Sequence, residues 1–202
     1  MTSSILKRTA AFTALLVAGC AAGPESPESS ELAFWVKPGV RALLPDQPCG
    51  IGGAQGRVEN AILTATRDGR TERIMTLRAC RDGVMSLDVM TLTGMALMSV
   101  TYDGRTLESK KHVPLPDALA PEQIVADILM GTLDSKAWSS LPLGYHFRMT
   151  ENSRTLVDEE GRTVERFTYE GERLARLEHE AFGYSIRFRY LEDAAPSDNT
   201  HE

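Results

Sequence analysis

The sequence is poor in cysteine and in aromatic residues, and it has fewer basic than acidic residues. Its 202 residues include 3 Cys and 6% aromatic residues, and 28 Asp and Glu outnumber 22 Lys and Arg, which gives a formal charge of -6. An acidic chain is a poor partner for a phosphate backbone, so nucleic-acid binding is not expected. No Cys-x-x-Cys pair is present, which argues against a redox couple and a cysteine-based zinc site.

The sequence also lacks the common catalytic motifs. The histidines are scattered, and none belongs to a His-Glu-x-x-His motif; they are His112, His146, His179 and His201. Neither a Gly-x-Ser-x-Gly elbow nor a Gly-rich phosphate loop that leads into a helix occurs. We therefore expect no enzymatic activity, no metal site and no cofactor.

One stretch, residues 84–102, is almost free of charge and rich in Met and Leu. Two apolar runs flank Thr91-Leu92-Thr93-Gly94, where the glycine can supply the positive φ of a tight turn. The pattern predicts a β-hairpin with Leu92 at its tip, suited to contact with an apolar partner. The alternative, a membrane-spanning helix, is disfavoured by Asp88 and by Gly94 within the stretch.

The N-terminus has the pattern of a secretory signal. Lys7 and Arg8 precede an apolar segment at residues 10–17, which is too short for a stable membrane span. We expect residues 1–19 to be a signal peptide. Its removal would change the formal charge from -6 to about -8, because Lys7 and Arg8 leave with it.

The end of this signal, Leu16-Val17-Ala18-Gly19-Cys20, resembles the lipobox of bacterial lipoproteins. The resemblance implies that Cys20 carries acyl chains such as palmitate, and that Ala21, which is not Asp, directs the protein to the outer membrane on its periplasmic face. Several acyl chains would hold it firmly on that membrane, at about 0.8 kcal/mol per buried CH₂. The alternative is an ordinary signal peptide followed by an incidental cysteine.

With Cys20 acylated, Cys49 and Cys80 remain as an even pair in an exported chain. We predict a disulfide between them, which would stabilise the fold by about 3 to 4 kcal/mol on the loop-entropy model. The alternative is two free buried thiols.

The composition divides the mature chain into three parts. Residues 20–31 are the lipidated cysteine and a Pro-, Ser- and Glu-rich tether that cannot bury enough surface to fold. Residues 32–191 have the length of one domain, and residues 192–202 form a polar tail.

Acidic-Gly dipeptides divide the domain into short strand-forming runs, as in antiparallel hairpins. They are Asp68-Gly69, Asp82-Gly83, Asp103-Gly104, Glu160-Gly161 and Glu170-Gly171. The predicted strands span residues 57–66, 72–80, 84–92, 95–102, 162–169, 173–179 and 182–190.

A single clear helix is predicted between the two groups of strands. Pro121 suits its first position, Glu122 favours its N-terminal dipole, and Gly131 suits its C-terminal cap. Ile124 and Ile128 belong to one apolar stripe, which must cover a sheet face.

The expected fold is mainly β (α+β): a curved antiparallel half-barrel sheet with one helical segment packed on its concave face. Such a sheet either fills its interior with side chains or leaves room for an acyl chain. Flexible Met side chains suit both an adaptable lipid pocket and an ordinary core, and on the methionines alone the core is the commoner explanation. The candidate ligand-binding residues are Met85, Leu87, Val89, Met90, Met98, Ile124, Ile128 and Trp138.

The lipobox, the tether, the strand runs and the single helix together resemble the LolA and LolB lipoprotein-sorting receptors. The segment from Leu87 to Gly94 is similar to the LolB segment in which two apolar strands meet at a Leu-Gly loop, and the resemblance implies a membrane-transfer role for Leu92. The closing pattern, with Tyr169 and Phe182-Gly183-Tyr184-Ser185-Ile186, resembles uncharacterised outer-membrane lipoproteins. Genes of that family tend to accompany fatty-acid-synthase-like enzymes such as those of aryl polyene biosynthesis.

These observations favour a lipid-anchored protein that binds an acyl chain or a lipidated partner in a β-sheet cavity and helps to transfer or localise it at the outer membrane. The alternative is a structural or adaptor lipoprotein of an envelope or aryl-polyene-type biosynthetic complex. An open apolar cavity favours the carrier. A filled core with an apolar surface patch favours the adaptor.

Overall fold

The computed structural model describes residues 32–50, 58–114 and 120–191. The expected signal peptide (1–19), the lipidated Cys20 with its tether (20–31) and the polar tail (192–202) lie outside these residues. No helix in the described segments is long and apolar enough to cross a membrane.

Strands make up most of the described chain. Ten of them form one sheet, and β1 and β2 form a separate hairpin. Their bounds are β1 Ala33–Lys37, β2 Val40–Leu43, β3 Val58–Arg67, β4 Arg70–Arg81, β5 Val84–Met90, β6 Ala96–Tyr102, β7 Leu107–Lys111, β8 His146–Met149, β9 Ser153–Val157, β10 Thr163–Glu170, β11 Arg173–His179 and β12 Tyr184–Tyr190.

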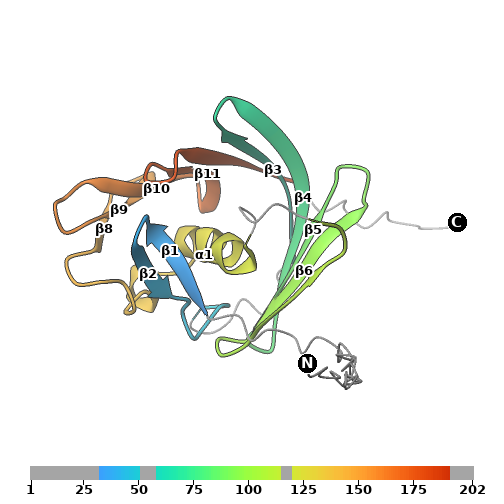
Figure 1. Ribbon diagram of the computed structural model, residues 1–202, viewed down its shortest axis with the longest axis horizontal. Helices are drawn as coiled ribbons and strands as arrows, with labels where there is room; N and C mark the ends of the chain where they lie inside the picture. The colour runs from blue at the N-terminus through green and yellow to red at the C-terminus, as the bar shows by residue number, and fades with distance from the viewer. Residues whose placement is uncertain (1–31, 51–57, 115–119, 192–202) are drawn as a thin grey trace, which may run out of the picture.

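The large sheet joins two antiparallel meanders. Its strand order is β7-β6-β5-β4-β3-β12-β11-β10-β9-β8, so β3 pairs with β12 where the two meanders meet. The sheet curves strongly and does not close into a barrel, and β7 and β8 are its two edges (Figure 1). This is the curved antiparallel half-barrel that the sequence predicts.

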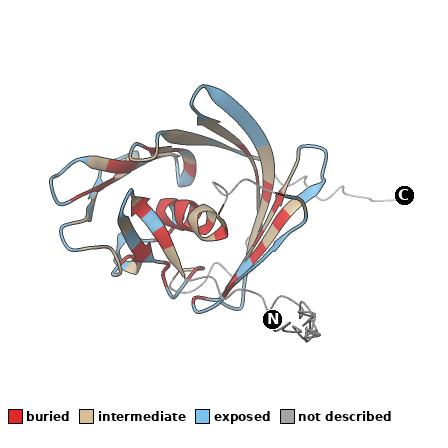
Figure 2. Cartoon of the chain, viewed as in Figure 1, coloured by how far each residue is buried: buried red, intermediate tan, exposed pale blue. Residues whose placement is uncertain are grey.

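One α-helix, α1 (Pro121–Thr132), lies on the concave side of the sheet, and the β1–β2 hairpin lies beside it (Figure 1). A short 3-10 turn, η1 (Ser135–Ala137), follows the helix. Buried residues concentrate on α1 and on the strands that surround it (Figure 2). The core therefore lies between the helix and the concave face, as predicted.

The Asp-Gly turns explain the tight first meander. Asp68 and Asp82 have φ of 50° and 52°, and the glycines that follow also have positive φ. Two consecutive residues with positive φ are typical of the type I′ turn, whose twist matches that of a two-residue hairpin. The turns thus join β3 to β4 and β4 to β5 directly.

The predicted strands agree with β3, β4, β5, β6, β10, β11 and β12 to within two residues at each end, whereas β1, β2, β7, β8 and β9 were not predicted. The helix begins at Pro121 as expected. Gly131, however, is not its cap: the helix continues through it, and Leu133 is the C-cap residue. A Cβ atom at Gly131 would lie 2.5 Å from the Leu174 side chain, so a close approach to the sheet explains the glycine.

Candidate functional site

The concave face holds most of the predicted ligand-binding residues. Met85, Leu87, Val89, Met98, Ile128 and Trp138 are each at most 8% exposed and belong to one hydrophobic core. Ile124 is partly buried against the same core, and the Trp138 ring meets that of Phe34 edge to face at 5.7 Å. The structure therefore brings seven of the eight predicted residues together.

Met90 does not join this group. Side chains alternate between the faces of a strand, and Met85, Leu87 and Val89 take the concave face of β5. Met90 therefore points to the convex face, where its neighbour across the ladder is Met75. The prediction that Met90 lines the inside was wrong, because it ignored this alternation.

The concave face is filled by side chains. The cavity between α1 and strands β3, β4, β5, β11 and β12 has a volume of about 20 Å³, although its lining includes Leu87, Ile128 and Phe188. Sites for drug-sized ligands have volumes of about 300 to 1,000 Å³. In this conformation the space accommodates about one water molecule.

A larger hollow of about 190 Å³ lies between the β1–β2 hairpin and the start of α1. Its lining includes Trp35, Arg41 and Glu122 and none of the predicted ligand-binding residues. The Arg41 guanidinium lies 5.2 Å from the centre of the Trp35 ring. This mixed polar and aromatic lining does not suit a hydrocarbon chain.

The C-terminal end of α1 is firmly attached to the sheet. Arg154 of β9 donates hydrogen bonds to the carbonyl oxygens of Met130, at 2.8 Å, and Leu133. Tyr169 of β10 donates to the carbonyl of Gly131 at 3.0 Å. Carbonyls at a helix C-terminus have no partner within the helix, so these donors satisfy them and complement the helix dipole.

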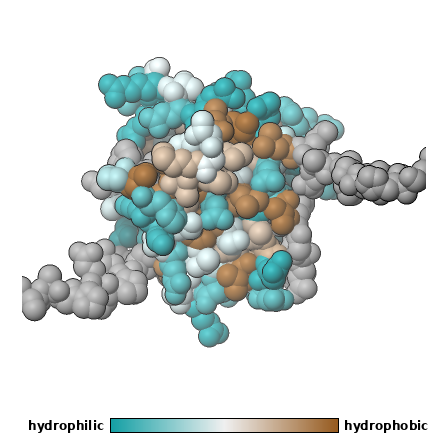
Figure 3. Space-filling view, turned by 90° about the vertical axis from the view of Figure 1, so that its right-hand side faces the viewer, coloured by the Kyte–Doolittle hydropathy of each residue, from teal (hydrophilic) through white to brown (hydrophobic). Residues whose placement is uncertain are grey.

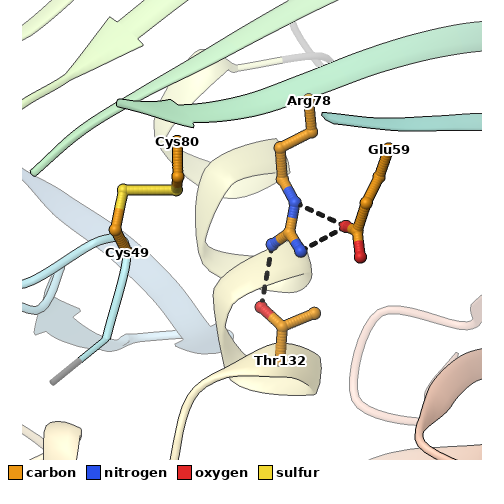
Figure 4. The surroundings of a disulfide bond; sticks show 5 residues. All are labelled: Cys49, Glu59, Arg78, Cys80 and Thr132. Carbon is orange, nitrogen blue, oxygen red and sulfur yellow. Dashed lines mark hydrogen bonds and ion pairs between the residues drawn. A yellow bond between two sulfur atoms is a disulfide. The ribbon is translucent and has the colours of Figure 1, made fainter. Parts of the chain in front are cut away.

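Beside this end, Arg78 of β4 links the sheet to the helix (Figure 4). Its guanidinium donates to Glu59 of β3 and, at 3.0 Å, to the hydroxyl of Thr132. Cys49 and Cys80 form the predicted disulfide nearby, with Cα atoms 5.8 Å apart, and tie the loop after β2 to the end of β4.

The middle of α1, at Asp127, faces a buried cluster of titratable groups. Asp127 accepts hydrogen bonds from Tyr184 at 2.6 Å and from Gln123 at 2.8 Å. Glu165 of β10 and His179 of β11 stand directly opposite each other in the ladder and are 0% and 1% exposed. Among the described residues, neither the Glu165 carboxyl nor the His179 ring has a hydrogen-bond partner.

The surroundings change the protonation of these groups. Burial raises the pKa of Asp127 to about 7, against the hydrogen bonds from Tyr184 and Gln123 that lower it. Burial, followed by the nearby charge of Asp127, raises the pKa of Glu165 well above its usual value. Burial lowers the pKa of His179 to about 4. The three groups therefore favour their neutral forms, as expected for an apolar site.

Sequence reasoning did not find this cluster. Glu165 has the same strand phase as Phe167, and His179 the same phase as Leu177, so both belong to the concave face by alternation. Asp127 follows Gln123 by one helical turn and faces the sheet. The strand phase was thus the available signal, and no pairing of these residues was visible without the fold.

The β5–β6 hairpin forms as predicted, and its tip is apolar and exposed. Gly94 has a φ of 85°, and the loop is closed by the hydrogen bond from Thr91 N–H to the Met95 carbonyl at 2.9 Å. The side chains of Leu92 and Met95 are 47% and 55% exposed. The hydroxyl groups of Thr91 and Thr93 form a hydrogen bond at 2.9 Å, which stabilises the loop that carries Leu92 and Met95.

Comparison with known proteins places the chain in a family without assigning an activity to it. No curated protein matches the sequence. The family model for DUF3261, described as a protein of unknown function, matches residues 60–192 and thus covers the large sheet and α1. The chain therefore belongs to the DUF3261 family.

Proposed function

We propose that this protein is a lipid-anchored outer-membrane protein that receives an acyl chain or a lipidated partner beneath α1 and passes it to the membrane at the β5–β6 tip. The observation that carries the proposal is the tip itself, where Leu92 and Met95 are about half exposed at the end of an otherwise ordered hairpin. Exposed apolar side chains at such a projection suit entry into a bilayer. The lipobox around Cys20 would keep the domain near that bilayer.

The concave face supports the acyl-binding part of the proposal. It is lined by aliphatic and thioether side chains and is covered by one helix rather than closed by further strands. Since the space is filled, an acyl chain enters only when α1 or the Met side chains beneath it move. Burial of hydrocarbon would supply the driving force, at about 25 cal/mol per Å² of buried surface, without a cofactor or a catalytic step.

The covering helix is held unevenly, which suggests how it would move. Arg154 and Tyr169 hold the C-terminal end of α1 by hydrogen bonds to its carbonyls. Nearer its middle, Asp127 lies close to the buried Glu165 carboxyl, which has no hydrogen-bond partner among the described residues. Buried polar groups without partners cost folding free energy, so the segment of α1 that precedes its C-terminal attachment would separate from the sheet first.

Mass spectrometry of retained lipids tests the acyl-binding part. The full-length chain with Cys20→Ala would be purified natively and scored for bound lipid and for uptake of a fluorescent fatty acid. We expect Ile128→Trp, on the face of α1 that packs against the sheet, to abolish uptake. Met90→Trp adds the same bulk on the convex face of the same sheet and should leave uptake unchanged. Equal uptake by all three chains would exclude the site beneath α1.

Transfer of the fluorescent fatty acid from the protein to vesicles tests the tip. Leu92→Glu places a charge where the bilayer would be entered, so we expect transfer to fall by at least tenfold while folding is retained, because the residue is exposed. Leu143→Glu makes the same substitution at a leucine that is 100% exposed between η1 and β8, and it is the matched control. If transfer survives Leu92→Glu, the tip has no such role.

A second candidate is the adaptor function, in which the sheet holds an envelope or biosynthetic complex together. The filled concave face favours it, because a filled face offers no preformed ligand site. An empty protein that takes up no fatty acid, and that recovers the same envelope complex with or without Ile128→Trp, would establish the adaptor and reject the carrier.

A further inference from the structure

Three arginines lie close together on the convex face of the sheet. Arg187 of β12 pairs with Thr64 of β3, and Thr64 pairs with Arg73 of β4. Arg187 and Arg73 therefore lie in one row across the sheet, on either side of Thr64. Arg189 stands two residues beyond Arg187 and therefore on the same face. With neighbouring strands about 4.8 Å apart, Arg73 lies about 10 Å from Arg187.

These arginines have no acidic partner within the described part of the chain, and all three side chains are exposed. Their neighbours differ in this respect: Arg176 contacts Glu178 at 2.8 Å and Arg166 contacts Glu180 at 3.4 Å. The chain as a whole carries a formal charge of -6, so composition does not account for a cluster of unpaired cations. Their positive charge is available to an external anion.

An apolar row runs beside the arginines on the same face. Ile62 of β3, which pairs with Arg189, also pairs with Met75 of β4, and Met75 pairs with Met90 of β5. The row ends at the hairpin tip that carries Leu92. Figure 3 shows apolar side chains gathered among hydrophilic ones on the side of the molecule where β4, β5 and β6 lie. This row thus changes from cationic at Arg189 to apolar toward the tip.

We propose that the convex face of β12, β3, β4 and β5 is a docking surface for an anionic phospholipid bilayer. Arg73, Arg187 and Arg189 would contact headgroup phosphates, for which the guanidinium fork is well matched. The apolar row would lie at the boundary with the acyl chains. Two arguments select the bilayer as occupant: the complementary charge, and the continuity of the surface with the exposed tip. A site beneath α1 is not needed for this contact, and the proposal is independent of acyl binding there.

The expected contribution of the charges is large enough to measure. Each basic residue near an anionic membrane surface strengthens binding by about fivefold, so the three together should contribute roughly a hundredfold. The contribution should decline with ionic strength, since exposed charges are screened within about 10 Å at 0.1 M salt and 3 Å at 1 M.

Vesicle co-sedimentation of the full-length Cys20→Ala chain tests the surface. The vesicles would contain phosphatidylethanolamine with about 30% of either anionic phosphatidylglycerol or neutral phosphatidylcholine, at low and at high salt. We expect binding to the phosphatidylglycerol vesicles only, and weaker binding at high salt. The variant Arg73→Gln/Arg187→Gln/Arg189→Gln should lose that binding.

A charge-matched control separates the site from the overall charge. Arg105→Gln/Lys136→Gln/Arg148→Gln replaces three exposed basic residues that lie outside β12, β3, β4 and β5 and changes the formal charge from -6 to -9, as the first triple does. We expect this control to bind like the parent chain. Equal loss in both triples, or equal binding to both kinds of vesicle, would overturn the proposal.

The tip provides a further discrimination. Leu92→Glu can abolish vesicle binding while the row variant, Arg73→Gln/Arg187→Gln/Arg189→Gln, binds like the parent. In that case the arginines play no part and the proposal fails, while the role of the tip stands. If the row variant fails to bind but still takes up fatty acid, the docking surface is supported separately from the acyl site. Circular dichroism spectra and unfolding midpoints of each variant would show that the fold is retained.

Discussion

The two faces of the large sheet differ in burial: the concave face is packed against α1, and the convex face is exposed to solvent. The concave face packs against α1 and buries even carboxyl groups, of which Glu165 is 0% exposed. The convex face presents charged and thioether side chains alternately with those of the interior, as Arg187 alternates with Phe188 on β12. Neighbouring residues on a strand therefore belong to different proposed sites. One side chain packs in the proposed acyl-binding site beneath α1, and the next is exposed on the proposed docking surface.

The largest expected difference between the faces is the cost of truncating an aliphatic side chain. Leu87 is 0% exposed on the concave face of β5, so Leu87→Ala should lower the free energy of unfolding by about 2 to 5 kcal/mol through lost burial and the cavity left behind. Met90→Ala, three residues away on the convex face, should cost less than about 1 kcal/mol. Chemical denaturation measures both, and similar costs would mean that the convex face is covered in solution.

Arginine substitution should separate the faces by a smaller amount. Arg154→Ala removes the donors to the end of α1 and should cost about 2 to 3 kcal/mol, because buried carbonyls lose their partners. Arg187→Ala, which is exposed, should change the free energy of unfolding by less than about 0.5 kcal/mol. Amide hydrogen exchange should show the loss in Arg154→Ala first in the last turn of α1. An unaffected last turn would contradict the assignment of Arg154 as the anchor of the helix.

The buried acids should make stability depend on pH. The pKa of Asp127 is raised to about 7 by burial and that of Glu165 is raised as well, so between about pH 4 and 7 the folded state binds more protons than the unfolded state. Stability should therefore fall as the pH rises through this range. His179 acts in the opposite sense below about pH 6.5, because burial lowers its pKa to about 4. The effect of the acids is clearest between about pH 6.5 and 8.

Glu165→Gln should remove part of this dependence. At pH 8 the variant should be more stable than the parent chain by about 1 kcal/mol or more, since it no longer has a carboxyl group to ionise, and near pH 3.5, where the carboxyl is protonated in both the folded and the unfolded state, the gain should vanish. Thermal unfolding at both pH values measures the difference. Glu172→Gln, an exposed residue at the β10–β11 turn, is the control and should not change the profile. A gain of the same size at both pH values would refute the ionisation of Glu165 as the cause.

Local chemistry made much of the fold predictable. The acidic-Gly dipeptides located the hairpins, the Pro121 start located the helix, and the cysteine count predicted the Cys49–Cys80 bond. The missed strands lack such signals. β7 reads Leu-Glu-Ser-Lys-Lys and has only Leu107 buried, because an edge strand needs little apolar surface. β8 is four residues long and shows no clear alternation.

The candidate sites were predictable only in part. Leu92 at a hairpin tip follows from the turn signal and the apolar runs around it. The misplaced Met90 shows that strand phase was available and was not applied. Glu165 and His179 face each other across the β10–β11 hairpin, and their approach to Asp127 depends on how α1 packs on the sheet. The alignment of Arg73 with Arg187 depends on the pairing of β3 with β12 across more than 100 residues of sequence. No local pattern encodes that pairing.

The two free edges of the sheet have a consequence for self-association. An unclosed antiparallel sheet offers unpaired backbone groups at each end, which invite a second copy to extend the ladder. Here one edge, β7, carries Glu108, Lys110 and Lys111 with exposed side chains, and the other, β8, is only four residues long. Exposed charged side chains on one edge and the short length of the other both oppose addition of another strand. Association of two copies through the edges of the described sheet is therefore disfavoured.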